Sequence, residues 1–204
     1  MRLFYSTLFM AVIALGVALN MSWMRADAQD DESPELLAFL GGVSENPVVI
    51  SPGSGEFEGN VVETASGEII RITYTLIYRD LKSTTDDTGT EIPGRVTQAH
   101  IHIGKDWENG DAVAFLCSNV EGAPAGTPAC PQPTAQTPEV TVEGTIEAND
   151  IQAAGIGATP EIIKAGDLNA LRQILLGGAS YVNLHTVAHP QGELRGPIFA
   201  EFAF

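Results

Sequence analysis

Two short stretches hold three of the four histidines of the chain, and they are the best starting point for predicting the fold. Residues 181–186 read Tyr-Val-Asn-Leu-His-Thr, and residues 99–104 read Ala-His-Ile-His-Ile-Gly. Each stretch alternates apolar and polar side chains, which is the period of a β-strand with one face on a core. The alternation predicts two strands whose histidines point away from the apolar side.

The side chains on the polar side of these strands suit a metal ion. Residues two apart in a strand project to the same side, so neighbouring strands would bring several of these side chains together on the outer face of the sheet. Imidazoles combined with an oxygen donor are good ligands for copper or zinc. The sequence predicts one transition metal ion, with copper favoured and zinc or iron also open. The candidate ligands are His100, His102, His185, Tyr181 and His189, surrounded by Asn183, Glu193 and Arg195.

A simpler interpretation of the same residues stays open. A His-x-His pattern alone is a weak signal, and polar side chains on the outside of a sheet need no function. Tyr181 suits packing or a hydrogen bond. Glu193 and Arg195 lie on the same side of a predicted last strand and are expected to form a structural ion pair.

The first 28 residues have the pattern of a secretory signal peptide. Arg2 supplies a positive charge, residues 8–19 are apolar and uncharged, and Ala26-Asp27-Ala28 offers a cleavage site. We expect residues 29–46 to be an N-terminal extension and the mature protein to be secreted or periplasmic, with no membrane span left after cleavage.

The charge balance and the cysteine content narrow the possible binding partners and the cellular compartment of the protein. The chain has 26 acidic and 10 basic residues, a formal net charge of −16. This balance argues against nucleic acid and anionic membrane surfaces, whose binding depends on Lys and Arg. The two cysteines, Cys117 and Cys130, predict a disulfide in an exported protein.

The remaining pattern predicts an all-β domain. Residues 68–79 alternate most clearly, and further strands are expected at 95–103, 112–117 and 140–146. The one convincing helix is 167–176, with Asp167 as its N-cap. We therefore expect an antiparallel, Greek-key-like β-sandwich or flattened barrel with one short helix.

Several motifs of the chain resemble those of a known family. The chain is similar to the CHRD domain, named after chordin and also found in exported microbial proteins. The resemblance covers roughly residues 47–204. It rests mainly on residues 97–104, 142–146, 178–186 and 192–196, the last reading Gly-Glu-Leu-Arg-Gly.

The resemblance implies an exported microbial member but little about activity. In chordin the repeats belong to an extracellular antagonist of bone morphogenetic proteins, whereas the microbial members have no settled activity. Since no nucleophile or nucleotide motif is present, we lean against an enzyme. Three hypotheses stay open: a metal-binding module, a non-catalytic extracellular module that binds an unknown protein partner or is structural, and, more distantly, a superoxide dismutase-like redox enzyme.

Overall fold

A computed structural model describes residues 34–81, 84–85, 91–92, 95–134 and 136–201. The main sheet consists of β1 (Glu35–Gly41), β2 (Ser54–Glu63), β3 (Ile69–Arg79), β6 (Val96–Ile103), β7 (Ala112–Ser118), β8 (Glu139–Ile146), β11 (Ser180–Thr186), β12 (Leu194–Pro197) and β13 (Phe199–Glu201). The smaller elements are η1 (Gly42–Ser44), β4 (Thr84–Thr85), β5 (Glu91–Ile92), η2 (Ala148–Asp150), β9 (Ala154–Ile156), β10 (Thr159–Ile163) and α1 (Leu168–Leu176).

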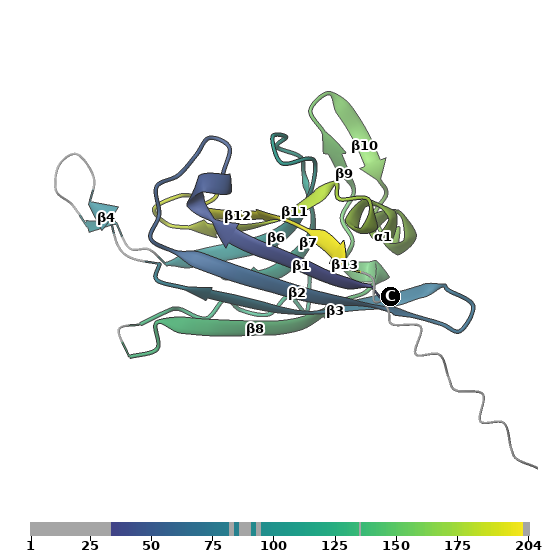
Figure 1. The fold of residues 1–204 in the computed structure, drawn as a ribbon, viewed down its shortest axis with the longest axis horizontal. Helices are drawn as coiled ribbons and strands as arrows, with labels where there is room; N and C mark the ends of the chain where they lie inside the picture. The colour runs from purple at the N-terminus through teal and green to yellow at the C-terminus, as the bar shows by residue number, and fades with distance from the viewer. Residues whose placement is uncertain (1–33, 82–83, 86–90, 93–94, 135, 202–204) are drawn as a thin grey trace, which may run out of the picture. The chain divides into compact units, whose positions relative to one another are not determined.

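The main sheet is antiparallel throughout and curls toward closure (Figure 1). Its strand order is β7-β6-β11-β12-β1-β2-β3-β8, with β13 beside β1. The two outermost strands, β7 and β8, approach each other. The Tyr74 hydroxyl on β3 donates a 2.6 Å hydrogen bond to the Leu116 carbonyl on β7 and ties the two ends of the sheet. The predicted all-β, barrel-like fold is confirmed.

Strand β3 supplies the centre of the core. Ile72, Tyr74, Leu76 and Tyr78 alternate along it and are buried, as their spacing predicts. Ile70 was expected on the same side, but it is 45% exposed. A register shift between β2 and β3 at Val62–Glu63 turns this end of the strand over.

The sheet begins earlier in the chain than the predicted domain start at residue 47. Strand β1 falls inside the predicted extension 29–46, yet it pairs with β2 on one side and with β12 and β13 on the other. Its side chains Leu36, Ala38 and Leu40 are buried in the core. The predicted signal peptide, residues 1–28, lies outside the described residues. Among the described residues, no helix is long and apolar enough to cross a membrane.

The predicted helix is confirmed as α1, the one α-helix in the part of the chain that the structure describes. The Asp167 side chain caps it by accepting a 2.9 Å hydrogen bond from the Ala170 N–H. Leu168, Leu171 and Leu175 lie at helical spacing and are buried against the sheet.

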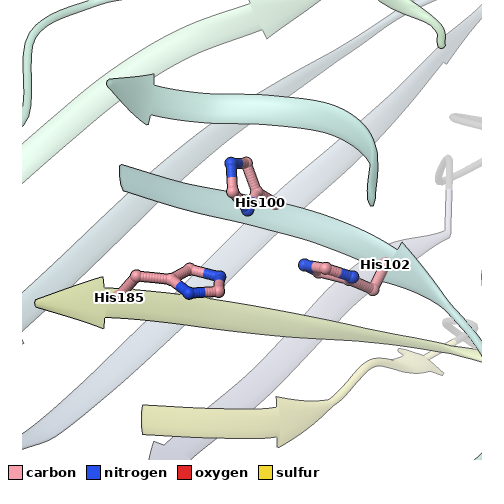
Figure 2. A group of neighbouring side chains, drawn as sticks. All are labelled: His100, His102 and His185. Carbon is pink, nitrogen blue, oxygen red and sulfur yellow. The ribbon is translucent and has the colours of Figure 1, made fainter. Parts of the chain in front are cut away.

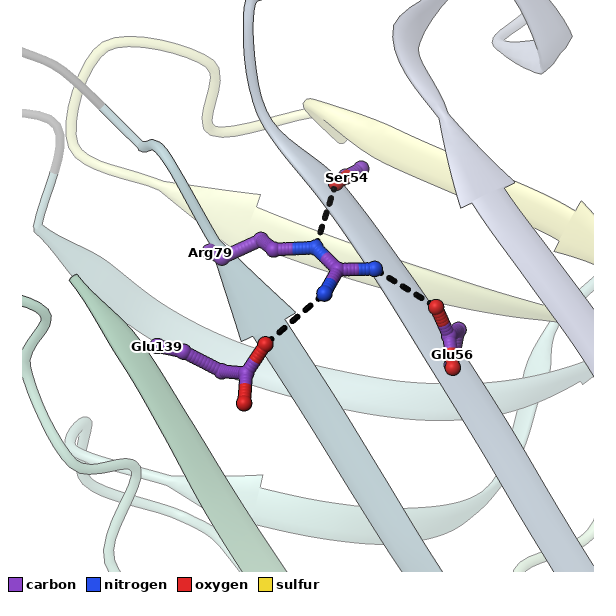
Figure 3. Close-up of polar contacts among 4 residues, drawn as sticks. All are labelled: Ser54, Glu56, Arg79 and Glu139. Atoms are coloured by element: carbon purple, nitrogen blue, oxygen red, sulfur yellow. Dashed lines mark hydrogen bonds and ion pairs between the residues drawn. The ribbon is translucent and has the colours of Figure 1, made fainter.

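A polar cluster crosses three strands on the outside of the sheet (Figure 3). The Arg79 guanidinium on β3 reaches Glu56 on β2 at 2.6 Å, Glu139 on β8 at 2.8 Å and the Ser54 hydroxyl at 3.2 Å. Because these side chains are solvent-exposed, their pairing adds little to stability. The buried core is the main support of the sheet.

The predicted disulfide between Cys117 and Cys130 is confirmed. It joins the end of β7 to a loop that is 13 residues further along the chain. Asn119 holds the same loop, because its Nδ2 donates to the Cys130 carbonyl and its Oδ1 accepts from the Cys130 N–H.

We predict that a Cys117→Ser, Cys130→Ser variant loses about 3 kcal/mol in free energy of unfolding, because an open loop of this size gains chain entropy when unfolded. Urea unfolding of the two proteins checks this value. Reduced wild-type protein serves as the control and should unfold like the variant. An unchanged urea midpoint would contradict the prediction.

Candidate metal centre

The pairing of β6 with β11 places the histidines side by side. In this antiparallel register His100 lies opposite Asn183, and His102 lies opposite Tyr181. His185, two residues beyond Asn183, projects to the same face. The two strands are therefore neighbours, which is the condition that the predicted site required.

Three of the four histidines form a cage (Figure 2). Each of His100, His102 and His185 offers a ring nitrogen, and these three atoms all lie within 4.8 Å of one another. The ring centroids of His100 and His185 are 5.0 Å apart, and those of His100 and His102 are 5.4 Å apart. Two strands alone supply all three side chains, so the sheet itself sets the spacing of the cage.

The cage lies on the face of the sheet away from the apolar core, but this face is not open to solvent. His100 is 4% exposed and His185 is 7% exposed. Every residue of β11 is buried, including those that point away from the apolar core. Strand alternation identified the side of the sheet correctly, but loops fold over that side. The Phe115 ring of β7 packs edge-on against His100 with the ring centroids 4.4 Å apart.

Backbone carbonyls fix the orientation of two of the imidazoles. His102 Nδ1 lies 2.9 Å from the Gly110 carbonyl, and His185 Nδ1 lies 3.1 Å from the Pro190 carbonyl. A carbonyl oxygen only accepts, so each Nδ1 carries the proton and each Nε2 keeps a free lone pair. Among the described residues neither Nε2 has a hydrogen-bond partner, and neither ring nitrogen of His100 has one.

Burial also keeps these rings neutral. Burial, together with the smaller effects of the neighbouring His185 and His102, lowers the pKa of His100 to about 3. Burial lowers the pKa of His102 to about 4, against an opposing effect of the Gly110 hydrogen bond. The pKa of His185 is lowered by the same desolvation. Neutral imidazoles are the form that binds metal ions.

Comparison with known proteins gives the family. The model of the CHRD domain matches residues 37–198. The chain belongs to the CHRD-domain family. No curated protein and no solved structure matches it. The matched segment begins within β1, in agreement with the position of that strand in the sheet.

The CHRD-like segment 192–196, Gly-Glu-Leu-Arg-Gly, packs against the cage. A Cβ at Gly192 would lie 2.5 Å from Glu45 Oε1 and 2.6 Å from Asn183 Oδ1, and the φ of Gly192 is +127°. Glycine is therefore required there for both space and conformation. At the other end, a Cβ at Gly196 would lie 2.4 Å from the Phe39 carbonyl of β1.

Arg195 and Glu193 are both buried, but the predicted ion pair between them was wrong. Both residues are described by the structure, and they form no salt bridge there. Glu193 instead accepts hydrogen bonds from the Ser51 hydroxyl at 2.7 Å and the Thr186 hydroxyl at 2.5 Å. The two carboxylate oxygens are occupied by hydroxyl groups of other segments.

The Arg195 guanidinium holds the loop of residues 104–111 over the site. It donates to the carbonyls of Lys105 and Glu108 and to Asn109 Oδ1, at 2.7–3.0 Å. It also lies 3.5 Å from the centre of the Tyr181 ring, a cation–π geometry. Tyr181 in turn stacks on His102 with ring centroids 5.0 Å apart. Arg195, Tyr181 and His102 form one continuous stack.

The two other predicted ligands lie apart from the cage nitrogens. The Tyr181 hydroxyl is at the Gly110 backbone, accepting from its N–H at 3.3 Å. His189 lies in the turn after β11, where its N–H donates to the Thr186 hydroxyl and its carbonyl accepts from the Gly192 N–H. His189 is not among the histidines whose ring nitrogens gather within 4.8 Å.

Sequence reasoning missed Glu45 and Phe115. Glu45 is 7% exposed, and burial raises its pKa to about 7, although the nearby Arg195 charge opposes this. No periodic pattern surrounds Glu45, so only the folded chain reveals its burial. Phe115, by contrast, lies opposite His100 in the predicted hairpin, and the pairing of 95–103 with 112–117 contained this signal.

We predict that the metal-free protein loses stability in acid because of the cage. The pKa values of the histidines are lower in the folded state than the usual 6.5. At a pH between the folded-state and unfolded-state pKa values, the unfolded chain binds more protons than the folded chain. The free energy of unfolding therefore falls as the pH drops below about 6.5. When the pH falls from 7.5 to 5, the free energy of unfolding of a His100→Gln variant should fall by about 2 kcal/mol less than that of the wild type.

Urea unfolding of both metal-free proteins across this range measures the difference. Glu45, whose raised pKa acts in the opposite direction, is present in both proteins and cancels. Parallel stability curves for wild type and His100→Gln would show that His100 is not held neutral.

Proposed function

We propose that this CHRD domain is an exported module that binds one transition metal ion through His100, His102 and His185, with copper as the favoured ion. One observation carries the proposal. Two buried imidazoles, of His100 and His185, and the half-buried imidazole of His102 offer ring nitrogens within 4.8 Å of one another, and each ring has a buried nitrogen without a hydrogen-bond partner.

The energetic argument starts from these unpartnered nitrogens. A buried polar atom without a partner costs about 1–3 kcal/mol, and native proteins rarely leave several of them together. Two of the rings present Nε2 lone pairs because carbonyls hold the protons on Nδ1. A carbonyl on the far nitrogen is the usual support for a metal-binding histidine. A metal ion would satisfy three of the four unpartnered nitrogens, one on each ring.

Ligand chemistry favours copper, with zinc as the main competitor. Imidazole suits copper, zinc and iron, and divalent copper binds most tightly among the common first-row ions. Metal–nitrogen bonds of about 2.0–2.1 Å require the three nitrogens to draw together from their present spacing. The three rings project from two paired strands, so small side-chain rotations supply this closure.

The disulfide and the burial of the cage indicate where and how the ion would be held. Disulfides persist in oxidising compartments, and the Cys117–Cys130 bond fits an exported protein. Burial of His100 and His185 suits retention of an ion for storage, delivery or redox protection.

We predict that untagged mature protein takes up one copper ion per chain and that a His100→Ala, His185→Ala variant takes up none, because one imidazole alone makes a weak site. Elemental analysis after dialysis checks the stoichiometry. His189→Ala is the matched control, since it removes a histidine outside the cage and should keep the full metal content.

Two outcomes would reject the metal-binding proposal. Equal metal content in the double variant and the wild type would place the metal elsewhere. A wild-type protein that takes up neither copper nor zinc would favour the alternative, a non-catalytic extracellular module that binds a protein partner or is structural.

A further inference from the structure

A pocket of about 380 Å³ lies where η1 meets the loop of residues 104–111. One wall comes from residues 43–46, around the end of η1, and the opposite wall from Asp106 and Trp107. Arg195 also lines it. The walls are joined by two hydrogen bonds, from Asn46 Nδ2 to the Trp107 carbonyl at 2.9 Å and from Asn109 Nδ2 to the Asn46 carbonyl at 3.0 Å. Two segments that are hydrogen-bonded to each other therefore form the pocket.

Glu45 connects this pocket with the interior. It lines the pocket, yet it is 93% buried, and its Oε1 is a buried oxygen without a hydrogen-bond partner among the described residues. Oε1 and the Asn183 side-chain amide both pack against Gly192, where an added Cβ would lie 2.5–2.7 Å from their atoms. Asn183 Oδ1 is likewise buried and without a partner.

Asn183 is the next polar side chain toward the cage. It lies directly opposite His100 in the β6–β11 register and between Tyr181 and His185 along β11. Glu45 and Asn183 therefore connect the pocket lining with the strand pair that carries the three histidines. Two unpartnered oxygens, on Glu45 and Asn183, lie along this connection.

We propose that this pocket is the entry site for the metal ion, with the Glu45 carboxylate as a transient ligand between solvent and the cage. The inference rests on the proposed function of the cage. Carboxylate and amide oxygens bind divalent cations readily and release them more easily than a set of three imidazoles. Asp106 at the pocket wall adds a second carboxylate on the solvent side.

Arg195 is the one positive group in the lining, and its guanidinium is fixed in place. It donates to two carbonyls and to Asn109 Oδ1, and it lies over the Tyr181 ring. Asp106 in the lining offsets its charge, and Glu45 adds a second carboxyl group. The net charge of the chain, −16, also attracts cations at long range.

Trp107 provides a direct optical signal for the test. It lines the pocket, it is 70% exposed, and it is the only tryptophan after residue 28. Stopped-flow mixing of metal-free mature protein with Cu²⁺ can follow quenching of its fluorescence, while elemental analysis of the same samples gives the final copper content.

Glu45→Gln should bind copper about tenfold more slowly than wild type, with the same final content of one ion per chain. Asp106→Asn, a substitution at an exposed side chain, should also slow uptake several-fold. Glu58→Gln is the matched control, because Glu58 is exposed on β2 and outside the pocket lining. Its rate should change less than about twofold, since salt screens distant surface charges.

Equal uptake rates for Glu45→Gln and wild type, with full copper content in both, would overturn the entry site alone. Equal slowing by Asp106→Asn and Glu58→Gln would also overturn it, because only the overall charge would then matter. Failure of the wild type itself to take up copper would overturn the proposed function together with this inference.

Discussion

The antiparallel register between β6 and β11 is the constraint on which the rest of the site depends. It sets His100 beside Asn183 and His102 beside Tyr181, and it leaves His185 on the same face. A slip of one residue would turn the side chains of one strand to the other face. If β11 slipped, His185 would enter the apolar core, and Val182 and Leu184 would leave it. The core and the cage therefore enforce the same register from opposite sides of the sheet.

A second feature of the structure is a layer of buried polar side chains outside the barrel. Arg195 secures the loop of residues 104–111, Glu193 binds hydroxyls from two segments, and Gly192 admits the Glu45 and Asn183 side chains. Buried charges require such hydrogen bonds, because an unpaired charge in a low-dielectric interior is strongly unfavourable. This layer removes water from the imidazoles, which keeps them neutral. It also explains why the segment 192–196 combines two glycines with two charged residues.

Much of the fold could be predicted from the sequence, because alternation and turn residues are local signals. The strand at 68–79, the helix capped by Asp167 and the side on which His100 and His185 lie were all predicted from spacing alone. Burial of that side could not be predicted, because it depends on loops that have no periodic pattern. The expected Glu193–Arg195 pair failed for the same reason: each side chain bonds to segments distant in sequence, and position on one strand does not reveal them. Glu45 lacks any local signal at all.

The most direct test of the account is a crystal structure of the copper-loaded mature protein with diffraction data collected at the copper absorption edge. We expect one anomalous peak, which marks a copper ion bonded to Nε2 of His102, Nε2 of His185 and a ring nitrogen of His100. An empty cage in crystals that contain copper elsewhere, for example at His189, would contradict it.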